Sequence, residues 1–377
     1  MPAEITRRQF IKNAFLFCAT LMSANLVSKA LRQETVFAAT GYDKEALYYN
    51  TLDKETVICL LCPRQCVLKN GQRSFCKVRE PRNGKLYTLV YELSCSAHVD
   101  PIEKKPIYHM LPGSKSFSIA TAGCNLRCKF CQNWQISQEY PENTSNRYLS
   151  CEDVVRFAIQ NSCRSIAYTY SEPTIFYEYM LNTARIAKAQ GIKNIWVTAG
   201  VINPAPLTEL CNVIDAANID LKGFSDTYLQ EVCDERLQPL LNAIKLTKQS
   251  GVWVEITNLI VPTLNDDMQM ISDMCAWIKE NLGGDTPLHF SRFWPMYKLK
   301  NLPPTPVETL KTAKQIAEEA GLNYVYIGNV PGEPGSNTHC PNCKKTLIER
   351  VGYFVLENNI VNSKCKFCGR GIAGVWG

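Results

Sequence analysis

Short apolar runs alternate with amphipathic stretches along much of the chain. We predict a strand at each run, at residues 117–121, 165–169, 194–199, 218–221, 252–261, 288–293 and 324–328. The stretches between them have helical periodicity, most clearly at residues 266–282 and 307–320. Parallel strands need helical crossovers, so this order predicts an α/β fold with a parallel sheet. The strand–helix units are too few for an eightfold barrel and predict an open, partial one.

Several predicted helices have clear start and stop signals. Ser150 and Asp153 have the spacing of a capping box. Pro173 is placed to open the next helix and Gly191 to close it, and Gly321 stops the last one. These residues therefore lie where the periodicity predicts that helices begin and end.

Residues 1–40 have the pattern of a targeting segment and are left out of the predicted fold. Arg7 and Arg8 precede Phe10 and an apolar run at residues 14–22. This order resembles a twin-arginine export signal, whose arginine pair is an address read by a receptor. The run is too short for a comfortable span, so we expect no stable membrane span. The alternative is an amphipathic surface helix that happens to carry the arginine pair.

The chain contains 18 cysteines, and their grouping favours metal binding over disulfides. We predict an N-terminal cysteine-rich region at residues 41–112. It contains a C-x2-C-x3-C-x9-C pattern, here called the N-terminal cysteines: Cys59, Cys62, Cys66 and Cys76. Four soft ligands in this span are suited to zinc or to a second iron–sulfur cluster, and the sequence does not choose between them.

A second group follows a Pro- and Gly-rich loop at residues 331–337. It consists of two C-x2-C knuckles separated by 21 residues. This spacing is typical of a zinc ribbon, so residues 331–377 are predicted to be a zinc-ribbon-like C-terminal segment. Its ligands, here called the C-terminal cysteines, are Cys340, Cys343, Cys365 and Cys368.

The third group is a C-x3-C-x2-C pattern directly after the first predicted strand, here called the cysteine loop: Cys124, Cys128 and Cys131. Three thiolates cannot close the four-ligand site of structural zinc. They can hold three irons of a [4Fe–4S] cube and leave the fourth iron open. The alternative of structural thiols is weakened by neighbouring Lys129 and Arg127, which favour thiolates. The spacing resembles the cluster motif of radical S-adenosylmethionine (SAM) enzymes.

Polar residues recur at the ends of the other predicted strands, where α/β barrels carry their functional groups. Each one alone could be structural, because Asp220 and Lys222 could simply pair and His289 could be a satisfied core histidine. Their shared position at one rim of the predicted barrel favours a functional role for the group. The residues are Glu172, Asp220, Lys222, Glu255, Asn258, His289 and Arg292.

Composition and charge agree with a globular enzyme. The 46% hydrophobic content supports a large core, and the net charge of +6 is scattered. Basic pairs such as Lys104-Lys105 and Lys344-Lys345 form no stripe, so we expect no nucleic-acid partner.

A more specific resemblance covers nearly all of the chain after the targeting segment. The chain resembles the radical SAM enzymes of the AmmeMemoRadiSam system, relatives of the pyruvate formate-lyase activating enzymes. The segments that carry this resemblance are residues 61–66, 100–106, 123–134, 168–179, 218–224, 257–266, 289–293 and 328–332, with both C-terminal knuckles.

The resemblance implies a partial (β/α)6-type radical SAM barrel at residues 113–330, with a [4Fe–4S] cluster on the cysteine loop and SAM on the open iron. One electron from the cluster would cleave SAM to methionine and a 5′-deoxyadenosyl radical, which abstracts hydrogen from a substrate. The implied activity is an activating-enzyme-like oxidoreductase. The resemblance assigns no catalytic residue. The SAM contacts that it implies come from Phe130, Gln132, Glu172, Asp220, Lys222 and His289.

The resemblance leaves the substrate open, with a protein as one candidate, and implies a low-potential electron donor. Two segments on the expected substrate side depart from the family pattern, at residues 198–201 and 293–296. An export signal and cytoplasmic SAM chemistry point to different compartments. The alternative class is a non-catalytic iron–sulfur or zinc protein for electron transfer or scaffolding, which would normally have a fourth thiolate near Cys131; the next cysteine along the chain is Cys151.

Overall fold

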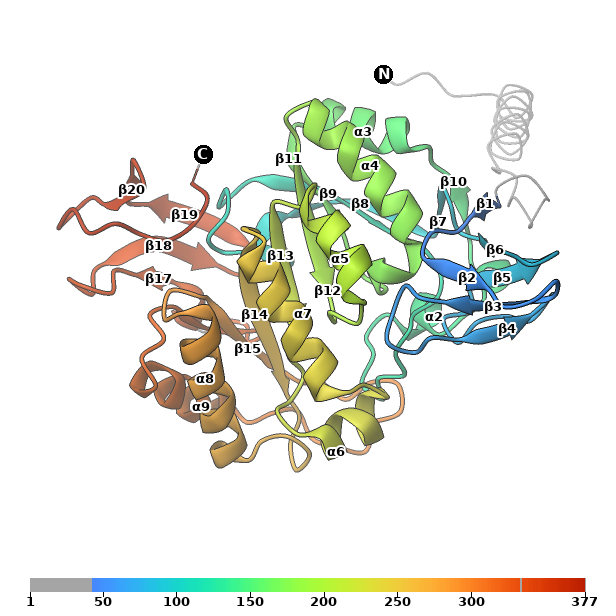
Figure 1. The fold of residues 1–377 in the computed structure, drawn as a ribbon. Coiled ribbons are helices and arrows are strands. Elements are labelled where there is room, and N and C mark those ends of the chain that lie inside the picture. Colours follow the sequence, from blue (N-terminus) through green and yellow to red (C-terminus); the bar gives the residue numbers. More distant parts are fainter. Residues whose placement is uncertain (1–42, 333, 377) are drawn as a thin grey trace, which may run out of the picture. The chain divides into compact units, whose positions relative to one another are not determined.

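The computed structural model describes residues 43–332 and 334–376. The predicted targeting segment at residues 1–40 lies outside them. Figure 1 shows a central sheet with helices against it, a region of small strands before the sheet in sequence and another after it.

The central sheet has eight strands in the order β16-β15-β14-β13-β12-β11-β9-β8. Neighbouring strands from β9 to β16 pair in parallel, and β8 pairs antiparallel with β9 at one edge. The strands are β8 (Ser96–Pro101), β9 (Lys115–Ala120), β11 (Cys163–Tyr168), β12 (Lys193–Thr198), β13 (Ala216–Asp220), β14 (Trp253–Ile260), β15 (Leu288–Arg292) and β16 (Val325–Gly328). The seven predicted strands are thus all present, in a mostly parallel α/β sheet.

The crossover helices cover one face of this sheet (Figure 1). They are α3 (Cys151–Gln160), α4 (Tyr177–Ala189), α5 (Pro204–Cys211), α7 (Leu237–Gln249), α8 (Met268–Leu282) and α9 (Val307–Glu319). Their apolar sides and the sheet form the main core. The predicted helix ends agree with the structure: the Ser150 hydroxyl accepts a hydrogen bond from the Asp153 N–H, and Gly191 has a φ of 73° just after α4.

Shorter elements connect these units. Pro173 opens the 3-10 turn η3 (Pro173–Phe176), which leads into α4. The others are η1 (Ile102–Lys104), α2 (Trp134–Ser137), η2 (Pro141–Asn143), α6 (Asp226–Tyr228), a π-helical turn η4 (Leu229–Cys233) and η5 (Pro334–Ser336).

The region before the sheet contains two small antiparallel sheets, ordered β1-β6-β5 and β2-β3-β4. Their strands are β1 (Lys44–Glu45), β2 (Tyr49–Thr51), β3 (Thr56–Cys59), β4 (Val67–Lys69), β5 (Arg79–Arg82) and β6 (Lys85–Thr88). β7 (Leu93–Ser94) pairs with β10 (Arg147–Tyr148). Arg79 anchors this region, because its buried guanidinium donates two hydrogen bonds to Glu178 in α4.

The region after the sheet is also built of short antiparallel strands. They are β17 (Thr338–His339), β18 (Thr346–Val351), β19 (Phe354–Asn358), β20 (Ile360–Val361) and β21 (Lys364–Cys365). Residues 102–111 and Val375 pack on the sheet face opposite the helices, against Ala167, Ile195 and Ala216. This face is therefore covered by two segments that lie far apart in the sequence.

Candidate functional site

The cysteine loop follows β9 at the carboxyl end of the parallel sheet. Cys128 is buried, and Cys124 and Cys131 are partly buried. Backbone hydrogen bonds hold the loop in place from two sides: the Arg127 N–H donates to the Cys233 carbonyl at 3.0 Å, and the Lys298 N–H donates to the Lys129 carbonyl at 2.9 Å. The three thiols therefore lie on a loop supported by the neighbouring segments.

Burial raises the pKa of Cys124 well above its usual range. A hydrogen bond with the Cys233 thiol, followed by burial, does the same for the pKa of Cys128, while the Lys222 ammonium acts in the opposite direction. Thiolates are the forms that bind iron, so a cluster would have to displace protons from these thiols. The contact with Cys233 was missed from the sequence, because these residues are far apart in the chain.

Lys222, which is buried, and Asp220, which is partly exposed, form a charged group beside the cysteine loop. The Lys222 ammonium lies 2.9 Å from a carboxylate oxygen of Asp220, as the spacing of the two residues suggested. Burial would lower the pKa of Lys222, but the charges of Asp220 and Cys128 raise it well above its usual range. The site thus contains a cation that can stabilise thiolates or a bound carboxylate.

Glu235 is a second buried group of this site that sequence reasoning missed. Neither of its carboxyl oxygens has a hydrogen-bond partner among the described residues. Burial raises the pKa of Glu235 to about 8, against the influence of Lys222. Such a buried, unpartnered acid is unusual and typical of functional sites. Glu235 follows a π-helical turn rather than a strand, so neither periodicity nor strand-end position could have identified it.

Glu172 lies where β11 turns into α4, and its carboxylate connects two strand ends. It accepts hydrogen bonds from the Thr174 N–H at 3.0 Å, the Thr198 hydroxyl at 2.6 Å and the Ala199 N–H at 2.8 Å. Its negative charge also contributes to the raised pKa of Cys124. The structure therefore brings Glu172 close to the cysteine loop, in a fixed orientation.

Phe130 and Gln132 differ in their exposure to solvent. Phe130 is buried in an apolar cluster with Val201 and Phe293, while Gln132 is exposed. Phe293 belongs to the loop after β15 that departs from the family pattern. An apolar wall beside the cysteines can exclude water from chemistry at this site.

His289 lies on the same sheet face as Asp220. The strand register pairs Asp220 with Thr257 and Thr257 with His289, so the three residues form one row across three strands. With strands about 4.8 Å apart, Asp220 and His289 are separated by roughly 10 Å. His289 donates from Nε2 to Glu255 at 2.7 Å, and its ring stacks on that of Tyr326.

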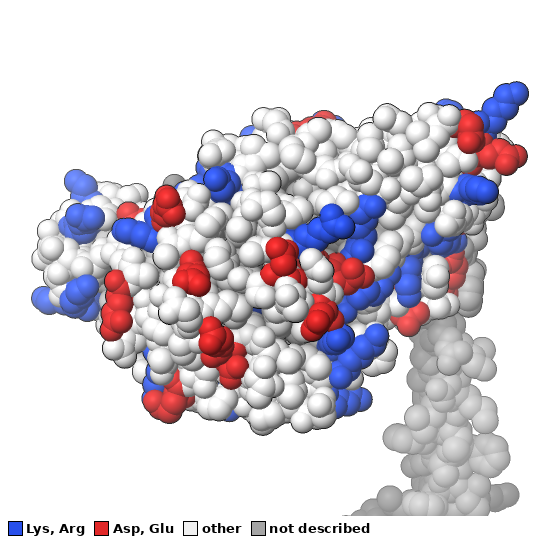
Figure 2. Space-filling view, turned by 60° about the horizontal axis from the view of Figure 1, so that its bottom comes forward, with Lys and Arg blue, Asp and Glu red and all other residues white. Residues whose placement is uncertain are grey.

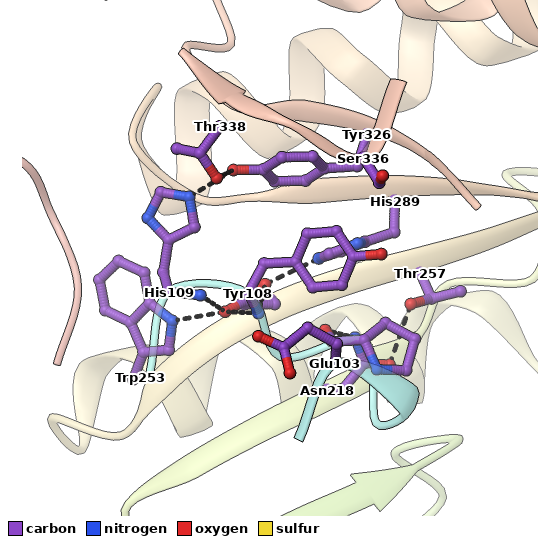
Figure 3. A network of polar contacts seen from close by, with 12 residues as sticks. Glu103, Tyr108, His109, Asn218, Trp253, Thr257, His289, Tyr326, Ser336 and Thr338 are labelled. Atoms are coloured by element: carbon purple, nitrogen blue, oxygen red, sulfur yellow. Dashed lines mark hydrogen bonds and ion pairs between the residues drawn. The ribbon is translucent and has the colours of Figure 1, made fainter. Parts of the chain in front are cut away.

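Glu255 is the centre of a buried network that joins the sheet to residues 102–111. Figure 3 labels its partners Tyr108, His109, Trp253 and His289. Its carboxylate also accepts hydrogen bonds from the Tyr108 N–H, the His109 N–H and the Trp253 indole. The His289 side chain, one of the predicted SAM contacts, is therefore engaged by a saturated carboxylate. The two other predicted rim residues contact backbone: Asn258 donates to the Leu221 carbonyl and Arg292 to the Thr305 carbonyl.

A cavity of 480 Å³ adjoins the charged group. Its lining includes Arg64, Val201, Gln230, Glu235 and Arg236.

Figure 2 shows acidic and basic side chains interspersed, without an extended basic stripe on the face in view.

The C-terminal cysteines converge on one point. The Sγ atoms of Cys340 and Cys368 lie 3.6 Å apart, and those of Cys343 and Cys365 lie 3.7 Å apart. All four sulfur atoms lie within 4.8 Å of one another. Hydrogen bonds from the Arg370 N–H and the Asn342 amide lower the pKa of Cys368 to about 6. This group could hold a metal ion.

Comparison with known proteins identifies the class of this enzyme. The profile of the radical SAM superfamily matches residues 118–278, which include the cysteine loop, Glu172 and Lys222. The chain belongs to this superfamily, and it is an enzyme of the radical SAM class.

Several individual proteins are similar to this chain. The uncharacterized protein MJ0808 of Methanocaldococcus jannaschii is 47% identical over 334 residues, which cover 87% of this chain and 98% of the relative. The pyruvate formate-lyase-activating enzyme of Clostridium pasteurianum is 24% identical over 42% of this chain and 66% of that enzyme. A domain of the corresponding enzyme of Bacteroides vulgatus ATCC 8482 aligns with 44% of this chain and 99% of the domain, at 19% identity and a TM-score of 0.39. Among the described residues, no helix is long and apolar enough to cross a membrane.

Proposed function

We propose that the chain cleaves SAM reductively at a [4Fe–4S] cluster held by Cys124, Cys128 and Cys131. Bound there, cluster and SAM would supply a 5′-deoxyadenosyl radical for hydrogen abstraction. The observation that carries the proposal is the set of three thiols, without a fourth in the loop, at the carboxyl end of a parallel sheet beside buried Lys222 and Glu235. The donor set fits the group, because one iron would keep an open position.

The surrounding residues would bind and orient SAM. Lys222 supplies positive charge next to Cys128, where it would stabilise the thiolates that hold the cluster. Glu172 has a fixed orientation beside Cys124 and offers carboxylate oxygens to an amino group. Phe130 would shield the adenine side from water, and exposed Gln132 would lie at its edge. Asp220 and His289 share the sheet face beneath.

The substrate proposal is coarser. We infer a protein substrate and a low-potential electron donor, as for activating enzymes, because sequence relatives carry that name. The motifs from residue 61 to the C-terminal knuckles support assignment to the AmmeMemoRadiSam system. The open sheet edges at β8 and β16 are consistent with a partial barrel at residues 113–330.

We also propose that the C-terminal cysteines bind zinc in a ribbon at residues 331–377. Four thiolates around a tetrahedral zinc, each about 2.3 Å from it, lie about 3.8 Å from one another. The sulfur distances of 3.6 and 3.7 Å come close to that value. Four thiolates complete the zinc shell, so the role of this site would be structural.

Anaerobic reconstitution with iron and sulfide tests the main proposal. The electron paramagnetic resonance spectrum of the reduced protein should change when SAM is added, and 5′-deoxyadenosine should form. Cys128→Ala should lose both properties, whereas Cys95→Ala, a control outside the three cysteine groups, should keep them. A spectrum that SAM leaves unchanged, without 5′-deoxyadenosine under strong reduction, would contradict the proposal and favour the electron-transfer alternative.

A further inference from the structure

The N-terminal cysteines come together in the folded chain. All four line one small cavity, together with Asn125 of the cysteine loop and Arg79. Cys59 and Cys76 are buried, and Cys62 and Cys66 are partly buried. The cavity is therefore a convergent set of four thiols, most of it shielded from water.

The spacing of these thiols differs from that of the C-terminal cysteines. The ligand atoms of the C-terminal cysteines all lie within 4.8 Å of one another. Within the described part of the chain, no other group of three or more potential ligands does so. No three of the N-terminal sulfur atoms meet that limit, although they share one cavity. Four thiolates on a single zinc are about 3.8 Å apart. In a [4Fe–4S] cube each thiolate binds a different iron, so the sulfur atoms lie farther apart.

Hydrogen-bond donors at the cavity are also suited to a cluster. The Nε–H of Arg79 is buried and has no partner among the described residues, although its other nitrogens bind Glu178 and the Leu47 carbonyl. The Ser74 hydroxyl lies 3.1 Å from the Cys76 sulfur. Donors of this kind stabilise thiolate and sulfide, and they tune the potential of iron–sulfur clusters.

We propose that Cys59, Cys62, Cys66 and Cys76 bind a second [4Fe–4S] cluster. This site lies against the cysteine loop: an added Cβ at Gly123 would be 2.4 Å from the Cys76 carbonyl oxygen. The Arg64 guanidinium donates to the Asn125 carbonyl at 2.6 Å, and Asn125 itself lines the cavity. The second cluster is therefore a neighbour of the SAM-binding one and uses none of its ligands.

The first test removes the cysteine loop as a ligand set. A triple variant, Cys124→Ala, Cys128→Ala and Cys131→Ala, is reconstituted anaerobically as the full chain, and iron, sulfide and zinc are measured. The expected result is about four irons and four sulfides per chain, with a reduced resonance signal that SAM does not change. This readout does not depend on SAM cleavage, so it can succeed or fail separately from the proposed function.

The second test leaves the cysteine loop intact. Cys62→Ala with Cys66→Ala removes two partly buried ligands, and the iron content should fall from about eight to about four. The remaining signal should still respond to SAM, which also shows that the variant is folded. Cys95→Ala should keep about eight irons. Zinc without iron in the triple variant, or an iron content that Cys62→Ala with Cys66→Ala leaves unchanged, would overturn the proposal.

Discussion

Replacing Gly123 with alanine should disrupt the junction between the cysteine loop and the N-terminal cysteines. Gly123 directly precedes Cys124 and has a φ of 92°, which side chains rarely adopt. Its added Cβ would lie 2.4 Å from the Cys76 carbonyl oxygen and 2.6 Å from a methyl of Val78. The methyl could move, but the carbonyl belongs to the backbone of the segment that carries the N-terminal cysteines. The substitution therefore requires the two segments to separate.

The expected loss combines two costs. Left-handed backbone in a residue with a Cβ costs about 1–2 kcal/mol. Overpacking typically adds about 1–3 kcal/mol. Together they predict a decrease of about 2–5 kcal/mol in the free energy of unfolding.

Gly71→Ala is the matched control. Gly71 has a φ of 74°, but an added Cβ would meet nothing within 4 Å. It should therefore lose only the backbone contribution of about 1–2 kcal/mol. The difference between the two variants isolates the contact with Cys76.

Anaerobic urea denaturation of both reconstituted variants, followed by tryptophan fluorescence, measures this difference. Iron content gives a second readout, because a displaced loop should bind its cluster less tightly. Equal losses of stability in the two variants, with unchanged iron in Gly123→Ala, would refute the close packing of these segments.

Three further predictions concern other parts of the chain. Burial lowers the pKa of His109 to about 4, against an ordinary value of 6.5, so its contribution to stability should be lost as pH falls from about 6.5 to 4. The loss in the free energy of unfolding is up to about 3 kcal/mol. It should be smaller in His109→Gln when unfolding is measured between these pH values, and identical pH profiles of the two proteins would contradict the prediction. Removing metal from the C-terminal cysteines with a chelator should release about one zinc per chain and expose that segment to protease, whereas protection without zinc would argue against a structural metal. Changing Arg7 and Arg8 to lysine keeps the charge but removes the guanidinium geometry, so it should abolish export in cell fractionation, and unchanged distribution of the two versions would rule out the signal.

The parallel sheet could be predicted from the sequence because its strands are buried on both faces. Such strands are continuous apolar runs, and the crossover helices between them have their own periodicity. β8 was not predicted as a strand of this sheet. Its residues are mostly exposed or partly buried and include His98 and Asp100, so the hydrophobic signal is weak.

The cysteine groups were also visible in the sequence, because local spacing identifies metal ligands. Contacts between loops that are distant in sequence were not visible. Cys233 lies against Cys128, and Glu235 reaches the same site from the turn that follows η4. Neither has a signal of its own in a single sequence, since only the packed loops bring them to the cysteines.

The sheet face opposite the helices is covered by segments that local sequence patterns could not have placed there. The Glu255 carboxylate binds the backbone of Tyr108 and His109, and the His109 Nδ1–H donates to the Ala373 carbonyl at 2.7 Å. The buried Arg350 donates to the Tyr108 carbonyl at 2.9 Å. The C-terminal segment is thus joined to the sheet through residues 102–111. Glu255 lies in the first half of β14, whereas the cysteine loop follows the carboxyl end of β9. Loss of the proposed C-terminal metal should therefore weaken the sheet at the end opposite the cysteine loop, and leave the geometry of that loop largely intact.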